Sequence, residues 1–120
     1  LLVGIQDADN EEIIQKMADK IYRVRIFEDE NEKMNLSLPQ VGGEILSISQ
    51  FTLYADCKKG NRPSFSLAGE RHHAEKMYLY FNEYMRSLGL KVDEGIFGAD
   101  MKVRLLNDGP VTIILDSSEW

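Results

Sequence analysis

The sequence predicts a mixed α/β fold in a single layered domain over residues 1–120, with a largely antiparallel sheet and two main helices. Three observations predict this class. Apolar residues recur at helical spacing in two segments, and they alternate with polar residues in several short ones. No repeat, linker or low-complexity tract divides the chain. Because 120 residues are enough to bury a core, we expect one domain.

The two helices are predicted from the positions of their apolar side chains. The first follows Asp9, which opens a capping-box pattern, and it carries Ile13, Met17 and Ile21 at intervals of four residues. The second is predicted to stop at Gly89, because glycine readily adopts the left-handed conformation that ends helices. Its apolar face consists of Ala74, Met77, Tyr78, Phe81, Met85 and Leu88.

The remaining apolar segments are short and read as strands. Alternation and turn residues predict strands over residues 1–5, 24–26, 44–54, 90–93, 101–106 and 111–115. The acidic stretch over residues 27–40 is predicted to be an exposed, irregular arm. Since the chain opens abruptly on a strand and has no initiator methionine, we expect the N-terminal strands of the gene product to be missing from it.

The charge of the chain limits the partners that it could bind. A formal net charge of -6 argues against a protein that coats nucleic acid by neutralising phosphates. It does not argue against one that touches only the end of a nucleic acid, and Lys58, Lys59 and Arg62 form a local basic cluster. A single cysteine, Cys57, fits a reducing compartment, and there is no signal or membrane-spanning segment. We therefore expect a cytoplasmic location and no membrane partner.

The titratable residues predict neither a metal site nor a cofactor. His72 and His73 are adjacent, so on a helix their side chains point about 100° apart. The acidic stretch over residues 28–32 lacks the ligand pattern and the glycine of a calcium loop. Neither group is expected to bind a metal.

Polar residues interrupt an apolar strand at Ser49-Gln50-Phe51-Thr52. On a regular strand, Ser49 and Phe51 face one side while Gln50 and Thr52 face the other. The segment therefore suggests a site of hydroxyls and an amide, with no acid–base pair. The alternative is that the hydroxyls only satisfy neighbouring backbone groups.

A second unusual segment is Asn107-Asp108-Gly109-Pro110, before the last predicted strand. The Gly109–Pro110 bond could adopt the cis form, since before proline the trans form is favoured by only about 0.5–1 kcal/mol. A cis bond would turn two neighbouring carbonyls to the same side and offer them to a ligand. A plain turn with trans proline is the alternative. Phe97-Gly98-Ala99-Asp100-Met101 could likewise shape a pocket or only pack a loop.

Taken together, these segments resemble the D-aminoacyl-tRNA deacylase family over essentially the whole chain. Each motif is weak by itself, but the ordered set is specific. The matching segments are Val24-Arg25-Ile26-Phe27-Glu28-Asp29-Glu30, Lys33-Met34-Asn35-Leu36-Ser37-Leu38, Gly43-Glu44-Ile45-Leu46, Ser49-Gln50-Phe51-Thr52-Leu53-Tyr54-Ala55-Asp56, Lys59-Gly60-Asn61-Arg62-Pro63-Ser64-Phe65, Phe97-Gly98-Ala99-Asp100-Met101 and Asn107-Asp108-Gly109-Pro110-Val111-Thr112-Ile113.

The resemblance implies a homodimer with active sites at the subunit interface. Ser49, Gln50, Phe51 and Thr52 would take the terminal adenosine and its ester-linked amino acid. Gly109 and Pro110 would form a cis dipeptide that reaches into the partner's pocket and excludes L side chains. The resemblance further implies substrate contacts by Phe97, Gly98, Ala99, Met101, Pro63, Ser64 and Phe65, and phosphate contacts by Lys58, Lys59 and Arg62.

The implied reaction is hydrolysis of the ester of D-aminoacyl-tRNA, with glycyl-tRNA(Ala) as a second substrate because glycine has no side chain to exclude. No general base stands out, which favours assistance by the ribose 2′-hydroxyl and backbone donors over a Thr52 nucleophile. The family opens with a strand whose arginine braces the Gly-Pro loop, and this chain has no match for it. Two other functions stay open: an editing domain for L-aminoacyl-tRNA, and a non-catalytic module that binds the tRNA end.

Overall fold

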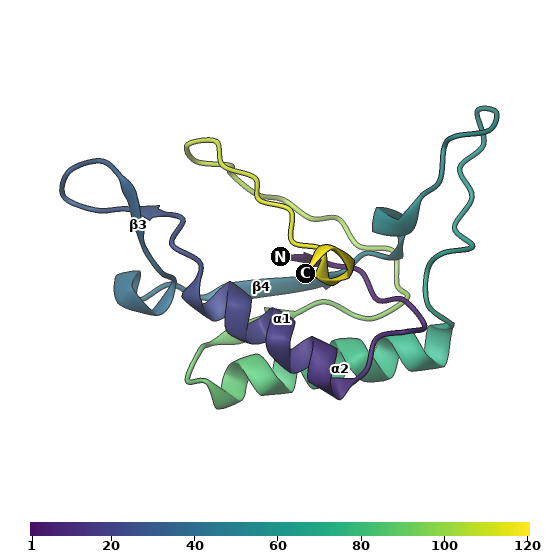
Figure 1. Ribbon diagram of the computed structural model, residues 1–120, viewed down its shortest axis with the longest axis horizontal. Helices are drawn as coiled ribbons and strands as arrows, with labels where there is room; N and C mark the ends of the chain where they lie inside the picture. The colour runs from purple at the N-terminus through teal and green to yellow at the C-terminus, as the bar shows by residue number, and fades with distance from the viewer.

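The computed structural model describes residues 1–120 and packs two helices against a small sheet (Figure 1). Helix α1 spans Glu11–Arg23 and helix α2 spans Arg71–Ser87. The main sheet has the order β1-β4-β5. Its strands are β1 (Leu2–Val3), β4 (Ile45–Ser49) and β5 (Val92–Glu94), and a separate hairpin pairs β2 (Phe27–Glu28) with β3 (Met34–Leu36). Single 3-10 turns are η1 (Pro39–Val41), η2 (Phe51–Tyr54) and η3 (Ser117–Glu119).

The mixed α/β class with two main helices is confirmed. The strand direction differs from the prediction, because β1, β4 and β5 all run parallel and only β2 and β3 are antiparallel. The helices explain the difference. Parallel neighbours need a long crossover connection, and α1 lies between β1 and β4 in the chain while α2 lies between β4 and β5.

Both helices begin and end close to the predicted positions. Helix α1 is capped by Asn10, not Asp9: Oδ1 of Asn10 accepts from the N–H of Ile13 at 2.9 Å. Asp9 is buried, and its carboxylate accepts from the N–H of Gln6 at 2.9 Å. Helix α2 is followed by Gly89, whose φ of 91° is the expected left-handed conformation.

Several predicted strands are shorter than expected or absent. Residues 24–26 precede β2, and the predicted irregular arm holds the β2–β3 hairpin, in which Phe27 pairs with Leu36. Residues 101–106 and 111–115 form no strand and make no backbone–backbone hydrogen bond. A strand requires a hydrogen-bonded neighbour, and these two segments have none within the chain.

The core lies between the helices and the sheet. The predicted inner face of α2 is buried, including Tyr78, Phe81 and Met85. The hydroxyl of Tyr78 donates to the carbonyl of Ser47 at 2.7 Å and so ties α2 to β4. No helix of the structure has both the length and the apolar character needed to cross a bilayer.

Both helices lie on one side of the sheet, and three extensions project on the other (Figure 1). They are the β2–β3 hairpin, the basic arm (residues 57–63) and the gate loop (residues 107–112). The basic arm is closed at its base by mutual backbone hydrogen bonds between Asp56 and Ser64, at 2.7 and 2.9 Å. The helices therefore form the core with one side of the sheet, and the extensions rise from the other side.

Candidate functional site

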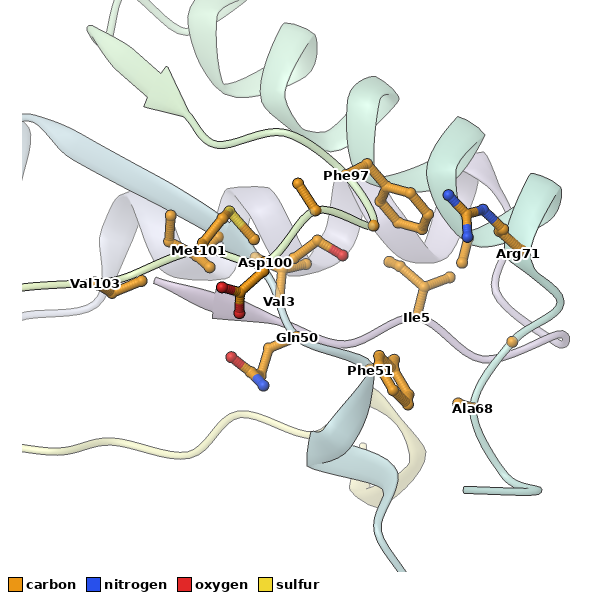
Figure 2. A pocket seen from close by; sticks show the side chains of 16 residues that line it. Val3, Ile5, Gln50, Phe51, Ala68, Arg71, Phe97, Asp100, Met101 and Val103 are labelled. Atoms are coloured by element: carbon orange, nitrogen blue, oxygen red, sulfur yellow. The ribbon is translucent and has the colours of Figure 1, made fainter. Parts of the chain in front are cut away.

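A cavity of about 480 Å³ lies where β4 ends, beside the start of α2 (Figure 2). We call it the site cavity. Its walls come from β1, the turn after β4, the first turn of α2 and residues 97–103. A volume of this size is typical of pockets that hold small organic ligands.

The site cavity brings together residues that are far apart in the sequence. Ser49, Gln50 and Phe51 line it from the end of β4. The predicted loop residues line it from the opposite wall, and they are Phe97, Gly98, Ala99 and Met101. The Ser49–Phe51 segment and the Phe97–Met101 segment therefore meet at one cavity.

The end of β4 sets the position of Gln50. Its backbone N–H donates to the carbonyl of Val3 at 2.8 Å, and the chain then leaves the sheet in the turn Phe51–Tyr54. The regular strand expected up to residue 54 is therefore wrong beyond Ser49. Because of this turn, the amide of Gln50 donates to the hydroxyl of Thr52, which is exposed and does not line the cavity.

The turn also leaves backbone donors free at the site. Its first hydrogen bond runs from the N–H of Leu53 to the carbonyl of Gln50 at 3.2 Å. The N–H groups of Phe51 and Thr52 precede this bond, so they have no acceptor within the turn. Such donors can bind a developing negative charge on oxygen.

Three predicted site residues, Pro63, Ser64 and Phe65, do not line the cavity. The ring of Phe65 packs edge-on against Phe51, with the ring centroids 5.1 Å apart. Ser64 closes the base of the basic arm through Asp56, and Pro63 precedes it. Phe65 thus supports the cavity wall, and Ser64 belongs to the base of the basic arm.

Gly109 and Pro110 do not line the cavity, because they lie in the exposed gate loop. The predicted cis bond between them is wrong for this structure, which has no cis peptide. The trans form is intrinsically favoured by about 0.5–1 kcal/mol. Because both residues are exposed, packing within the chain does not offset this preference. Gly109 has a φ of 124°, a conformation that favours glycine.

Lys58, Lys59 and Arg62 are all exposed on the basic arm, and none of them lines the cavity. The arm projects beyond the body of the domain (Figure 1). The three predicted phosphate contacts therefore lie on one extension, outside the site cavity.

Sequence reasoning missed several cavity residues. They are Val3, Ile5, Ile48, Ala68, Gly69, Arg71, Ala74 and Val103. Most carry no signal in sequence beyond being apolar. Gly69 is an exception in structure: its N–H donates to the carbonyl of Ile5 at 2.8 Å, and a Cβ there would lie 3.0 Å from that oxygen. This close approach of two backbones favours glycine.

Only two ionisable side chains line the cavity, Arg71 and Asp100. Asp100 is almost fully exposed and lies 3.4 Å from the Lys102 ammonium. No histidine and no second acid line the cavity beside it, so the cavity holds no pair of side chains for acid–base catalysis. The cavity thus offers an amide, a hydroxyl, backbone N–H groups and one guanidinium.

The first turn of α2 is held by Glu70. Its carboxylate accepts from the N–H groups of His72 and His73, both at 3.0 Å, and its own N–H donates to Asp7 at 2.7 Å. The two backbone hydrogen bonds hold the pKa of Glu70 below its ordinary value of 4.5. This cap fixes the helix start that carries Arg71 to the cavity.

Glu70→Gln is expected to lower the melting temperature at neutral pH, because the amide is a weaker cap than the carboxylate. A lowered pKa means that the charged cap stabilises the fold above pH 4.5 and that this contribution is lost as the pH falls through the folded-state pKa. The gap between wild type and variant should therefore close on acidification. Thermal unfolding across this range measures it. Glu28→Gln, on the exposed hairpin, should show no such gap, and a pH-independent gap for Glu70→Gln would contradict the prediction.

Comparison with known proteins decides the family. The family model described as D-Tyr-tRNA(Tyr) deacylase matches residues 1–116. The chain belongs to this family. The predicted family is thus confirmed, and with it the class of enzyme, a hydrolase.

Two relatives illustrate how similar this chain is to other proteins. A D-aminoacyl-tRNA deacylase of Bifidobacterium animalis subsp. lactis (strain AD011) is 60% identical over 119 residues, which cover 99% of this chain and 75% of the relative. One from Halothermothrix orenii (strain H 168 / OCM 544 / DSM 9562) is 53% identical over 119 residues, with 99% and 80% covered.

Solved structures show the same family fold. The "c-Myc DNA Unwinding Element Binding Protein" is 42% identical with a TM-score of 0.87, covering 96% of this chain and 78% of that one. A "probable eukaryotic D-amino acid tRNA deacylase" has a TM-score of 0.76 at 14% identity, covering 86% and 76%. At that identity the second match shows the fold alone.

Proposed function

We propose that this protein hydrolyses the ester of D-aminoacyl-tRNA and releases the free D-amino acid and the tRNA. The observation that carries the proposal is the site cavity, where Ser49, Gln50 and Phe51 meet residues 97–101 in a chain of the deacylase family. The relatives named D-aminoacyl-tRNA deacylase support the substrate.

The terminal adenosine and its amino acid would occupy the site cavity. Phe51 is half-exposed and braced by Phe65, so its ring can stack on a base. The amide of Gln50 can hydrogen-bond polar groups of the ribose or the base. Both side chains lie on the same wall of the cavity (Figure 2).

The hydrolysis would proceed without a side-chain base. Water adds through its oxygen to the ester carbonyl carbon, the bond to the ribose oxygen breaks, and the water proton passes to that oxygen. The ribose 2′-hydroxyl is well placed to relay this proton, because it neighbours the ester. The free N–H groups of Phe51 and Thr52 would bind the charge that develops on the carbonyl oxygen.

Thr52→Ala tests this mechanism against a threonine nucleophile. We expect the rate of hydrolysis to stay within about tenfold of wild type, because Thr52 takes no covalent part in the proposed mechanism. Removing a covalent nucleophile would instead lower the rate on the order of 10⁶-fold. Single-turnover deacylation measures the rate, with Ser66→Ala, another exposed hydroxyl, as the control. A complete loss in Thr52→Ala alone would establish the covalent route in its place.

The active unit would be a homodimer. Residues 101–115 expose large apolar side chains, including Leu106 at 90% and Ile114 at 88%, and they make no backbone–backbone hydrogen bond. Exposed apolar residues beside unpaired backbone are typical of surfaces that bind another chain. The gate loop lies within this segment, so in a dimer it could reach the partner's site cavity and exclude L side chains with the carbonyls of Gly109 and Pro110.

Pro110→Ala is expected to lower the preference for D over L esters more than it lowers substrate binding, because it loosens the gate loop. The preference is measured as the ratio of single-turnover rates for matched D and L esters. Sedimentation of the same variant reports whether the dimer persists. An unchanged ratio in an intact dimer would count against the gate.

Further features of the substrate follow from these assignments. Glycyl-tRNA(Ala) would be cleaved as well, because glycine has no side chain for the gate to exclude. The basic arm would contact phosphates of the acceptor end through Lys58, Lys59 and Arg62. Aminoacyl-tRNA as the substrate would place the enzyme in the cytoplasm.

The deciding experiment is single-turnover deacylation of matched D-tyrosyl- and L-tyrosyl-tRNA. Rapid loss of the D ester with the L ester spared would support the proposal. Cleavage of the L ester alone or of both esters would instead indicate an editing domain. Binding without cleavage would indicate a non-catalytic module that binds the tRNA end.

A further inference from the structure

Arg71 is the one cationic side chain that lines the site cavity, and its charge is not balanced within the chain. The structure contains five ion-pair contacts, and none of them includes Arg71. No hydrogen bond engages its guanidinium with another side chain either. Arg71 is exposed, so an anionic group of a ligand in the cavity could reach its guanidinium without breaking an ion pair.

Two acids at the start of α2 already bind backbone donors. Glu70 turns its carboxylate onto the backbone of α2 and caps His72 and His73. Asp7 accepts from the N–H of Glu70. The start of α2 is therefore rigid, and these two carboxylates make contacts that do not involve the guanidinium.

Gly98 provides the space in which the guanidinium lies. A Cβ at position 98 would lie 2.6 Å from Nη2 of Arg71, and the residue has a φ of +76°. The positive φ favours glycine there, and the short distance places the guanidinium beside the backbone of the opposite cavity wall. The guanidinium of the exposed Arg71 thus lies at one end of the cavity.

The position of this end relative to the rest of the cavity is visible in Figure 2. Phe97 and Ile5 lie between Arg71 and the end that holds Gln50 and Met101. Phe51 lies on the same side of the cavity as Ile5. A nucleoside against the aromatic rings would therefore have one end near Gln50 and the other near Arg71.

We propose that Arg71 binds the phosphate that joins the terminal adenosine to the rest of the tRNA. This inference rests on the proposed function and deepens it. An aminoacyl ester has no free carboxylate, so phosphates are the only anions of the substrate. The planar guanidinium can donate two parallel hydrogen bonds to phosphate oxygens, which would fix the depth and direction of the nucleoside. Arg71 is thus a substrate-positioning residue and takes no part in bond cleavage.

The test compares two minimal substrates, D-tyrosyl-adenosine and its 5′-monophosphate, in the full chain. We expect the wild type to prefer the phosphorylated ester by at least about tenfold in kcat/KM, mainly through KM. Arg71→Gln should remove this preference, so that kcat/KM on the phosphorylated ester falls to the value on the unphosphorylated one. Arg71→Lys should keep part of it, because lysine retains the charge without the planar fork.

Arg23→Gln, an exposed arginine at the end of α1, is the matched control and should keep the full preference. An unchanged preference in Arg71→Gln, or an equal loss on both esters, would overturn the proposal. So would a weaker inhibition by free D-tyrosine with the phosphate preference intact, because Arg71 would then bind the product carboxylate. D-tyrosyl-tRNA is assayed in parallel: if wild type leaves it uncleaved, the proposed function fails, independently of Arg71.

Discussion

Replacing Phe81 by alanine is expected to destabilise the protein by about 3–5 kcal/mol. Phe81 is 2% exposed and belongs to the core between α2 and the sheet, so its removal leaves a cavity that the close-packed helix cannot fill. Domains of this size are stable by only about 5–15 kcal/mol. The loss is therefore a large part of the total, and urea unfolding followed by circular dichroism measures it.

Leu79→Ala is the matched control for this prediction. Leu79 lies on the same helix but is exposed, so its truncation should cost about 1 kcal/mol or less. Equal losses for the two variants would contradict the prediction, because burial in the core would then not set the cost of truncation. Comparable slopes of free energy against urea would show that both variants unfold in the same way as wild type.

Replacing Phe51 by alanine is expected to lower kcat/KM for D-aminoacyl-tRNA by about 5-fold to 150-fold, because a base stacked on an aromatic ring contributes about 1–3 kcal/mol. Phe51 lines the site cavity and packs against Phe65, so its ring is held in place before substrate binds. Stability should change little, since the ring is 56% exposed. Deacylation at substrate concentrations below KM measures the effect.

Leu53→Ala is the control, because Leu53 lies in the same turn and is 55% exposed but does not line the cavity. Its kcat/KM should stay near that of wild type. If Leu53→Ala lost as much activity as Phe51→Ala, the turn as a whole would matter and not the aromatic ring. If neither lost activity, the adenosine would have to bind elsewhere.

Local patterns in the sequence were sufficient for the helices and for the family. The apolar spacing of α2 and the position of Gly89 predicted its buried face and its end, because side chains three and four residues apart necessarily share a face of a helix. The ordered motifs, from Ser49-Gln50-Phe51-Thr52 to Gly109-Pro110, predicted the family that the comparisons confirm.

The limits of the strands and their pairing were harder to predict from the sequence. Polar residues at the end of β4 looked like a continued strand, yet the chain turns at Phe51 because the neighbouring β1 ends at Val3 and offers no further partner. The segments over residues 101–106 and 111–115 alternate as strands do, but nothing in the chain pairs with them. Pairing depends on a second segment, which a local pattern does not contain.

By itself, the sequence determined the fold class, the two helices and the family, since each depends on patterns within short stretches. Only the tertiary structure decided that β1, β4 and β5 run parallel, that residues 49–51 and 97–101 share one cavity, and that Arg71 lies against Gly98. The physical reason is the same in each case. These features are contacts between residues distant in the chain, and they form only when the packing of α2 on the sheet brings their backbones together.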